Sequence, residues 1–351
     1  MSGVAEAVPG DLRIVPAPRY HHLVRLSDGT GVFEHALHED ARLEHGYCLD
    51  DVARALLVVV REPVQNDTLG VLAETSLRFI EAAVVGDGRA HNRRAVGGMW
   101  TDEPGTGDWW GRAVWALGVA VGAAPTPLMR ARALRAFTRA ARQSSPHLHA
   151  SAFAALGACA VLRTRPGDVA ARRIVRHLIG MIPPPSGRSW QWPQARMTYG
   201  SGSIAEALLS AGVAMDDAST TARGLELVRF VLDRETADGR LSVTGTAGRG
   251  PEDHGRMFDQ QPIEVAAIAD ACAAAFEVTG AREWLDGVRL AWAWFDGDND
   301  SGTPMVDRAT GAGFDGLEIA GRNENRGAES TLDALSTWQL AYRYAGMRST
   351  S

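Results

Sequence analysis

The sequence predicts an all-α protein built as an (α/α)6 toroid, a closed ring of helical hairpins. Three observations lead to this class. Apolar residues recur at the i, i+3, i+4 spacing of a helix in segment after segment. These segments alternate between Ala-rich stretches, apolar on all sides, and amphipathic Arg-rich stretches, which predicts an inner and an outer ring of helices. Polar segments rich in Trp, Gly, amides and carboxylates recur at intervals of roughly forty to sixty-five residues, the room for one hairpin and a loop.

The expected helices follow one another along most of the chain. They span 51–61, 68–84, 111–123, 128–142, 150–164, 169–182, 203–215, 220–234, 263–278, 282–295 and 327–344. Residues 31–39 carry the same spacing and are a candidate twelfth helix, whereas 240–246 is the one short strand candidate. We expect residues 1–30 to be an irregular lead-in, 31–346 a single toroid domain and 347–351 a tail. A solenoid would contain similar hairpins but more regular repeats.

Composition and charge exclude several classes of partner. The 351 residues carry a formal net charge of -6 with a pI near 5.9, and the dispersed arginines form no stripe along which a phosphate backbone could lie. No nucleic-acid partner is therefore predicted. No apolar run reaches the roughly 18 residues of a membrane span, and the first residues lack a secretion signal. We expect a cytoplasmic protein without membrane contact.

The cysteines and histidines predict neither a disulfide framework nor a metal site. Cys48, Cys159 and Cys272 cannot form a closed set of disulfides, and two of them lie in Ala-rich helical patterns, so buried free thiols are expected. The histidine pairs lack zinc spacing with partner ligands, and phosphate-loop and dinucleotide motifs are missing. The sequence thus predicts no metal and no cofactor, and leaves the oligomeric state open.

In such a toroid the inner helices run parallel, so their N-termini meet on one rim together with the polar loops. Unpaired N–H groups and positive dipole ends favour carboxylates and ligand oxygens there. Asp50 and Asp51 open the first inner helix. Adjacent helical positions point about 100° apart, so we expect one of them to cap the helix and the other to enter the cavity. Tyr47, in the preceding turn, is a candidate sugar contact.

The second rim loop combines carboxylate, aromatic and basic side chains. Asp108 precedes a helix and could be its N-cap or a ligand, and Arg112 could pair with it or bind a substrate acid. Tryptophan faces stack on the C–H faces of pyranose rings, so the tryptophans of this loop are candidate subsite walls. The same rim would hold a histidine and an asparagine from just upstream, although a structural hydrogen bond would explain those two equally well. The candidates of this loop are Trp100, Trp109, Trp110, His91 and Asn92.

Three further loops repeat the combination of aromatic, amide and acid residues. In the segment DQQPIE, the spacing of Gln261 and Glu264 fits a capping box, which leaves Asp259 and Gln260 unexplained. The loop before the last helix crowds amides and acids, either as an Asx-rich turn or as a ligand site. The candidate sugar contacts from these loops are Trp190, Trp192, Tyr199, Gln260, Gln261, Glu264, Asp315 and Asn325, and Glu329 lies in the first turn of the last helix within reach of the cavity.

Four segments also resemble a known family. They read HGYCLDDVARAL, RAHNRRAVGGMWTDEPGTGDWWGRAVWALG, FDQQPIEVAAIADAC and NENRGAESTLDAL. They are similar to the α/α-toroid helical domain found alone, or fused behind sugar-nucleotide transferase domains, in many bacterial proteins. The resemblance extends from about His21 to about Tyr344 and implies a toroid that handles carbohydrate. The chain departs from the family's Tyr-Asp-Asn-Ala pattern, because Gly200 and Ser201 replace the acid and the amide.

A saccharide-processing enzyme is the function that these observations favour. In a glycoside hydrolase two carboxylates flank the scissile bond, and the candidates are Asp50 or Asp51 on one side and Asp259 or Glu329 on the other. A wide ring leaves room for a water between them, so inversion is expected. A sugar isomerase or 2-epimerase would instead need opposed bases, for which the rim histidines are His149 and His254. A non-catalytic glycan-binding module is the third reading.

Overall fold

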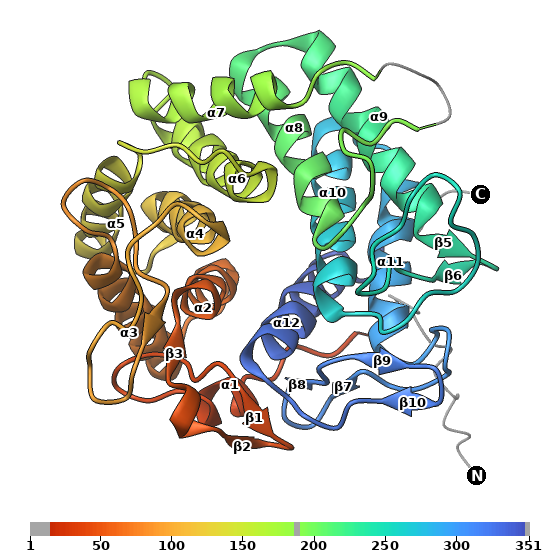
Figure 1. Cartoon of the computed structure of the whole chain (residues 1–351), viewed down its shortest axis with the longest axis horizontal. Helices are drawn as coiled ribbons and strands as arrows, with labels where there is room; N and C mark the ends of the chain where they lie inside the picture. Colours follow the sequence, from red (N-terminus) through yellow and green to blue (C-terminus); the bar gives the residue numbers. More distant parts are fainter. Residues whose placement is uncertain (1–14, 186–189, 348–351) are drawn as a thin grey trace.

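The computed structural model describes residues 15–185 and 190–347, which form a ring of helices around a central axis (Figure 1). Each inner helix packs on the next, and the last closes onto the first. This closure confirms the predicted all-α toroid and excludes an open solenoid. The inner helices are α2 (Leu49–Arg61), α4 (Asp108–Ala123), α6 (Leu148–Thr164), α8 (Ser201–Met215), α10 (Pro262–Thr279) and α12 (Ala328–Arg343).

A second ring of helices surrounds the first. It consists of α3 (Asp67–Ala83), α5 (Pro127–Ala140), α7 (Val169–Met181), α9 (Ala218–Arg234) and α11 (Trp284–Phe295). The sixth hairpin has no long outer helix in the described residues; α12 packs on α11 and on the five-residue helix α1 (His21–Arg25). Because α1 lies within 1–30, the expectation of an irregular lead-in is wrong there. Residues 1–14 of the lead-in and 348–351 of the tail lie outside the described part.

Short antiparallel ladders decorate the loops, and the sequence did not predict most of them. They pair β1 (Ala36–Leu37) with β2 (Asp40–Ala41), β3 (Tyr47–Cys48) with β4 (Arg93–Arg94), β5 (Thr236–Ala237) with β6 (Arg240–Leu241), β7 (Val306–Asp307) with β8 (Ala312–Gly313), and β9 (Leu317–Glu318) with β10 (Gly321–Arg322). The twelfth helix predicted at 31–39 is wrong. The chain reverses at His38, whose φ of 51° breaks a helix, and Phe33 bridges to Tyr47.

Side chain size explains how closely the inner helices pack. On α4 and α6, a Cβ added to Gly118 would lie 2.1 Å from the carbonyl oxygen of Gly157, and one added to Gly157 would lie 2.2 Å from that of Val114. Only glycine fits such backbone-to-backbone contact. The outer helices instead bury one stripe, as in α5, where Met129 and Ala133 are buried at helical spacing.

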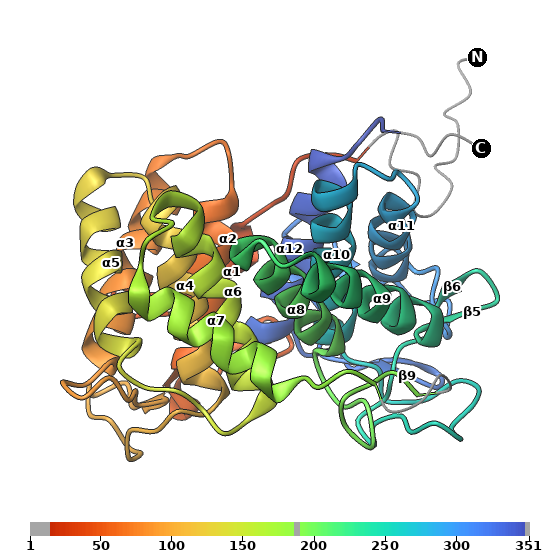
Figure 2. The same ribbon diagram turned by 90° about the horizontal axis from the view of Figure 1, so that it is seen from above.

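The two rings differ in how their helices begin. Four outer helices start with a side chain that accepts a backbone N–H, namely Asn66, Thr126, Asp168 and Asp217. None of the six inner helices has such a bond from its N-cap residue. Their N-termini lie on the side of the ring that carries the long loops and hairpins (Figure 2). The rim therefore concentrates backbone donors without side-chain caps.

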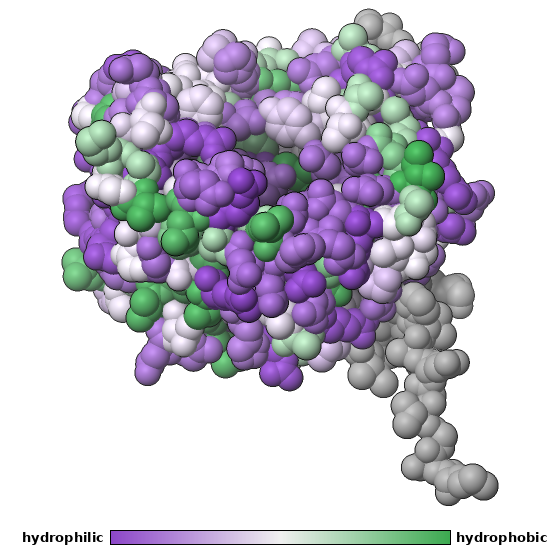
Figure 3. All heavy atoms as spheres, turned by 60° about the horizontal axis from the view of Figure 1, so that its bottom comes forward, coloured by the Kyte–Doolittle hydropathy of each residue, from purple (hydrophilic) through white to green (hydrophobic). Residues whose placement is uncertain are grey.

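Cys48, Cys159 and Cys272 are all buried and free, as predicted. Within 15–185 and 190–347, no helix has the length and apolar character needed to cross a membrane. The face drawn in Figure 3 is largely hydrophilic, with apolar residues scattered over it rather than gathered in one large area.

Candidate active site

A cavity of about 470 Å³ opens on the rim where inner helices begin. The N-terminal residues of α2, α4 and α12 and the N-cap residue of α10 contribute to its walls, together with the loops that precede these helices. Its size falls within the range of small-molecule sites, and its lining is unusually polar. The lining residues are Glu34, His35, Cys48, Asp50, Asp51, Asn92, Arg93, Asp108, Trp109, Gln261, Asp315, Gly327, Glu329 and Ser330.

Two buried arginines hold the acids of the cavity floor in place. Arg54 Nη2 lies 2.6 Å from Glu329 Oε2 and 3.5 Å from Asp50 Oδ2, and its Nη1 lies 3.4 Å from Asp333 Oδ2. Arg112 Nε lies 2.6 Å from Asp50 Oδ1, an ion pair whose angle does not suit a hydrogen bond. Asp50 is thus held between two guanidinium groups. It neither caps α2 nor presents a free carboxylate.

Asp51 differs from every other acid of the floor. The residue is 4 % exposed and lines the cavity, yet its carboxyl group makes no hydrogen bond or ion pair with the described residues. Burial raises the pKa of Asp51 well above its usual range, and the charges of Asp50 and Glu329 raise it further, against the opposing effect of Arg54. Asp51 therefore keeps its proton to higher pH than an ordinary aspartic acid does.

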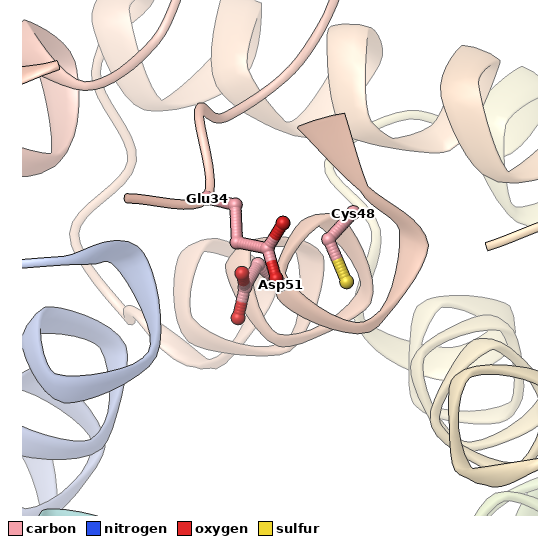
Figure 4. A group of neighbouring side chains, drawn as sticks. All are labelled: Glu34, Cys48 and Asp51. Atoms are coloured by element: carbon pink, nitrogen blue, oxygen red, sulfur yellow. The ribbon is translucent and has the colours of Figure 1, made fainter. Parts of the chain in front are cut away.

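Glu34 and Cys48 meet Asp51 at one side of the cavity (Figure 4), where one donor atom of each lies within 4.8 Å of the others. Such a mixed sulfur and oxygen set is of the kind that binds Zn²⁺. In this arrangement the Cys48 thiol donates to Asn92 Oδ1 at 3.2 Å, and burial raises its pKa. Arg93 forms an ion pair with Glu34. The Arg93 guanidinium thus already supplies a positive charge to this cluster, and the Cys48 thiol is neutral. Cys48 and Asp51 are the proton donors that the cluster offers to the cavity.

Asp108 and Trp109 form another part of the lining. Of the two roles predicted for Asp108, the N-cap is wrong, because Gly107 is the N-cap of α4; the Asp108 carboxylate accepts the Tyr199 hydroxyl at 2.6 Å. The indole of Trp109 donates to Ala90 O at 2.8 Å and lies so close to Gly107 that a Cβ there would come within 2.3 Å of the ring. A fixed aromatic face and a fixed carboxylate thus border the cavity.

The loops that precede the inner helices supply amides and a further acid to the cavity. Asn92 lines the cavity, and Asp102 accepts its backbone N–H at 2.6 Å. Asp315 also lines the cavity, and its Oδ1 accepts Gly327 N at 2.7 Å and Ser330 Oγ at 2.6 Å. This contact ties the acid loop to the start of α12. Gln261, the N-cap residue of α10, lines the cavity without a side-chain capping bond.

Several expected aromatic contacts lie elsewhere. Tyr47 is 1 % exposed and stacks on Phe33, and Trp110 and Trp192 are 1 % and 4 % exposed, so these three belong to the core. Trp190 packs edge-on against Phe230 of α9, outside the cavity. The polar surroundings that suggested a sugar site serve these rings instead, because each indole N–H has a backbone acceptor.

Histidine and tryptophan also pair away from the cavity lining. His91 stacks on Trp100 with centroids 5.2 Å apart, and its Nδ1 lies 2.7 Å from Asp102 O. Asn325 binds the backbone N–H of His38 through its side chain at 2.9 Å. Tyr199 stacks on His149 at 4.2 Å and reaches the cavity through Asp108. These five side chains support the rim rather than form its inner wall.

The motif DQQPIE divides between core and rim. Gln260 is fully buried, where it accepts the indole N–H of Trp294 at 3.0 Å. The capping box expected for Glu264 is wrong, because its carboxylate accepts Gly200 N at 2.9 Å at the start of the neighbouring helix α8. Asp259 is exposed and does not line the cavity. Of the expected catalytic acids, the structure therefore brings Asp50, Asp51 and Glu329 together.

Sequence reasoning missed six charged or titratable side chains of this site, among them Cys48, which it predicted only as a buried thiol. Two of them had a local signal, because Arg54 stands four residues after Asp50, an ion-pair spacing, and Arg93 follows the candidate Asn92. Glu34 and His35 lay inside the helix that was wrongly predicted. Asp333, whose pKa is raised to about 7 chiefly by burial, lies one turn beyond Glu329 on α12.

Comparison with known proteins supports the fold. No protein-family model matches the sequence, and no curated protein matches it. Among solved structures, the cellobiose 2-epimerase from Bacillus thermoamylovorans B4167 has a TM-score of 0.71 at 11% identity, over 93% of this chain and 96% of that one. A sugar epimerase from a ruminal bacterium has a TM-score of 0.69 at 12% identity, over 93% and 95% of the two chains.

A cellulase from C. cellulolyticium, solved with cellobiose, has a TM-score of 0.61 at 9% identity, over 90% of this chain and 88% of that one. At such identities the likeness shows the architecture, an α/α toroid, and leaves the reaction to be argued from the site.

Proposed function

We propose that this protein is an inverting glycoside hydrolase in which Asp51 is the general acid and Glu329 the general base. The observation that carries the proposal is Asp51 itself, an unpaired carboxyl group, 4 % exposed, in a polar cavity and with a raised pKa. Enzymes obtain an acid that is protonated near neutral pH in this way. The toroidal neighbours, a cellulase and sugar epimerases, support a saccharide as the substrate.

In the proposed reaction, Asp51 donates its proton to the glycosidic oxygen as the bond to the anomeric carbon breaks. Glu329 accepts a proton from a water that attacks the same carbon from the opposite face, which inverts its configuration. The side chain of Glu329 is 44% exposed, so water reaches it, and Arg54 at 2.6 Å orients it. Afterwards Asp51 regains a proton from solvent and Glu329 releases one. Inversion needs about 6.5–9.5 Å between the two carboxyl groups.

The remaining lining residues fit the binding of sugar hydroxyl groups. Trp109 forms an aromatic part of the cavity wall. Asp108 and Asp315 supply acceptors, and Asn92 and Gln261 supply amides. Asp50 takes a positioning role in this proposal, because Arg54 and Arg112 already neutralise it. Its negative charge raises the pKa of Asp51.

The test is hydrolysis of nitrophenyl glycosides and disaccharides in both anomeric series, followed by proton NMR of the first product anomer. Asp51→Asn and Glu329→Gln should each lower kcat by roughly 10²–10⁴-fold with the fold intact. Asp67→Asn, an exposed first-turn acid of α3, and Glu324→Gln, an exposed acid of the loop before α12, are matched controls that should keep full activity. Undiminished turnover by Asp51→Asn would overturn the proposal. Retained configuration in the first product would refute inversion.

A sugar isomerase or 2-epimerase is the second candidate, favoured by the epimerase structures among the neighbours. The histidines expected for it are poorly placed. His149 is 7 % exposed with Nε2 2.7 Å from Tyr199 O, and His254 is exposed away from the cavity lining. An epimerase would incorporate deuterium from D₂O into recovered sugar without new reducing ends. A glycan-binding module would neither incorporate deuterium into the sugar nor release reducing ends. A bound glycan would still protect it against unfolding.

A further inference from the structure

The charges around the rim cavity do not balance. Six of its lining residues are acids, and they include one arginine as counter-charge, Arg93. Burial lowers the pKa of His35, so its imidazole adds no positive charge near neutral pH. Arg54 and Arg112 lie at the floor. The ion pairs of these three arginines with acids of the cavity and its floor go to Glu34, Asp50, Glu329 and Asp333. With Asp51 protonated, two lining carboxylates remain without an ion pair in the described part of the chain.

Asp108 is the first of these two carboxylates, and it has a free oxygen. Its Oδ2 accepts the Tyr199 hydroxyl at 2.6 Å, whereas Oδ1 accepts no hydrogen bond from the described residues. Arg112, one turn later on α4, could have paired with it, but the Arg112 Nε lies 2.6 Å from Asp50 Oδ1. Burial lowers the pKa of the nearby His149, which therefore stays neutral.

Asp315 is the second. Its Oδ1 already accepts two hydrogen bonds from the start of α12, whereas Oδ2 accepts none from the residues that the structure describes. Arg322 and Arg326, the arginines of the same loop, stack on Phe314 and pair with exposed acids outside the cavity lining. Neither arginine forms an ion pair with Asp315, so its charge also faces the cavity uncompensated.

A ligand with a positive charge suits this cavity better than a neutral or acidic one. Asp51, a buried carboxyl group without a partner in the described residues, marks the cavity as a ligand site independently of the charge count. Trp109 lines the wall next to Asp108, and an ammonium group is attracted both by an indole face and by a carboxylate. A uronic acid would instead bring its carboxylate to the charges of Asp108 and Asp315, which is unfavourable.

We propose that the saccharide bound in the rim cavity is an amino sugar with a free ammonium group, and that Asp108 Oδ1 accepts one of its N–H groups. Asp315 adds to the negative charge that attracts this ammonium. The inference rests on the proposed function in taking a saccharide as the ligand. It goes beyond it in naming the class of sugar.

The experiment is calorimetric titration at pH 6.5 of the full chain carrying Asp51→Asn, which stops the proposed hydrolysis. The ligands are the β-1,4-linked disaccharide of glucosamine, its di-N-acetyl form and cellobiose, which share ring and linkage and differ in charge. The glucosamine disaccharide should bind at least about tenfold more tightly than cellobiose, because it adds a charge-assisted hydrogen bond. Acetylation should remove this advantage, and added salt should reduce it.

Two further substitutions in the same chain locate the effect. Asp108→Asn should bring the glucosamine disaccharide to within about threefold of cellobiose, because the amide keeps an acceptor but loses the charge. Asp259→Asn, which removes an exposed rim acid outside the cavity lining, is the matched control and should keep the full preference.

Four results would each overturn the proposal: no binding of the glucosamine disaccharide, binding no tighter than that of cellobiose, a preference that Asp108→Asn leaves unchanged, or an equal loss in Asp259→Asn. The hydrolase proposal fails separately. Tight binding of the glucosamine disaccharide without its cleavage by the unaltered chain would refute hydrolysis and uphold the sugar class. Hydrolysis of neutral glycosides without any preference for the charged sugar would do the reverse.

Discussion

Replacing Glu206 by glutamine should stabilise the protein at alkaline pH. In the folded chain, burial raises the pKa of Glu206 from 4.5 to about 8, so the native state holds this proton where the unfolded chain has lost it. Stability is then fully present below the unfolded pKa and is lost as pH rises through the folded one. Glutamine has nearly the same size and does not titrate, and Oε2 has no protein partner to lose.

The magnitude follows from the pKa difference. Each pKa unit corresponds to about 1.4 kcal/mol, so the window from 4.5 to about 8 sets a ceiling of about 5 kcal/mol. Water that reaches Glu206 when it ionises lowers this ceiling. We expect the free energy of unfolding of Glu206→Gln, relative to the unaltered chain, to increase by about 2–4 kcal/mol between pH 4.5 and pH 9.

Urea unfolding followed by tryptophan fluorescence, at several pH values across that window, measures the difference in an amine-free buffer. Glu226→Gln, an exposed acid on the outer helix α9, is the control and should track the unaltered chain at every pH. Parallel stability curves for Glu206→Gln and the unaltered chain would refute the reasoning. They would mean that Glu206 ionises in the native state as freely as it does in water.

Three further predictions concern the rim and the packing of the rings. The kcat/KM of the hydrolysis should fall as pH rises through the raised pKa of Asp51, and this limb should vanish in the residual activity of Asp51→Asn. Arg54→Met should lower the free energy of unfolding by about 3–5 kcal/mol in urea, because it leaves the buried Asp333 carboxylate without its cation; a loss below 1 kcal/mol would contradict that role. Gly157→Ala should lower the melting temperature by many degrees or prevent folding, whereas Gly180→Ala, in open space on α7, should be neutral or stabilising by about 0.5–1 kcal/mol.

The architecture could be predicted because its signals are local. Helical periodicity and the contrast between Ala-rich and Arg-rich segments are set within one helix, and the inner and outer rings followed from the alternation. The helix predicted at 31–39 is wrong because the conformation around residues 31–41 depends on distant partners. Phe33 bridges to Tyr47, and the carbonyl of Glu34 accepts Ala328 N at 3.0 Å from the far end of the chain. Helical spacing alone could not reveal those contacts.

The site was predicted where a carboxylate begins an inner helix and missed where a partner comes from another helix. Asp50, Asp51 and Glu329 carried a first-turn signal, but the cation that links Asp50 to Glu329, Arg54, lies more than 270 residues from its other partner Asp333. Tryptophans near polar loops were overvalued for a related reason. A buried indole needs an acceptor for its N–H, and an adjacent loop with free carbonyl groups supplies one, so polarity around Trp110 reflected burial rather than ligand contact.

The contrast between capped outer and uncapped inner helices gives the rim its chemical character. A capping side chain contributes about 1 kcal/mol and occupies donors that a ligand could otherwise use. At α8, whose first residues do not line the rim cavity, Glu264 binds the N–H groups of Gly200 and Ser201. At α2, α4, α10 and α12, whose first residues or N-cap residue line it, the N-cap residue makes no such side-chain bond. The helix starts at the cavity thus lack a cap from their own N-cap residue, which leaves first-turn acids such as Asp51 and Glu329 to line it.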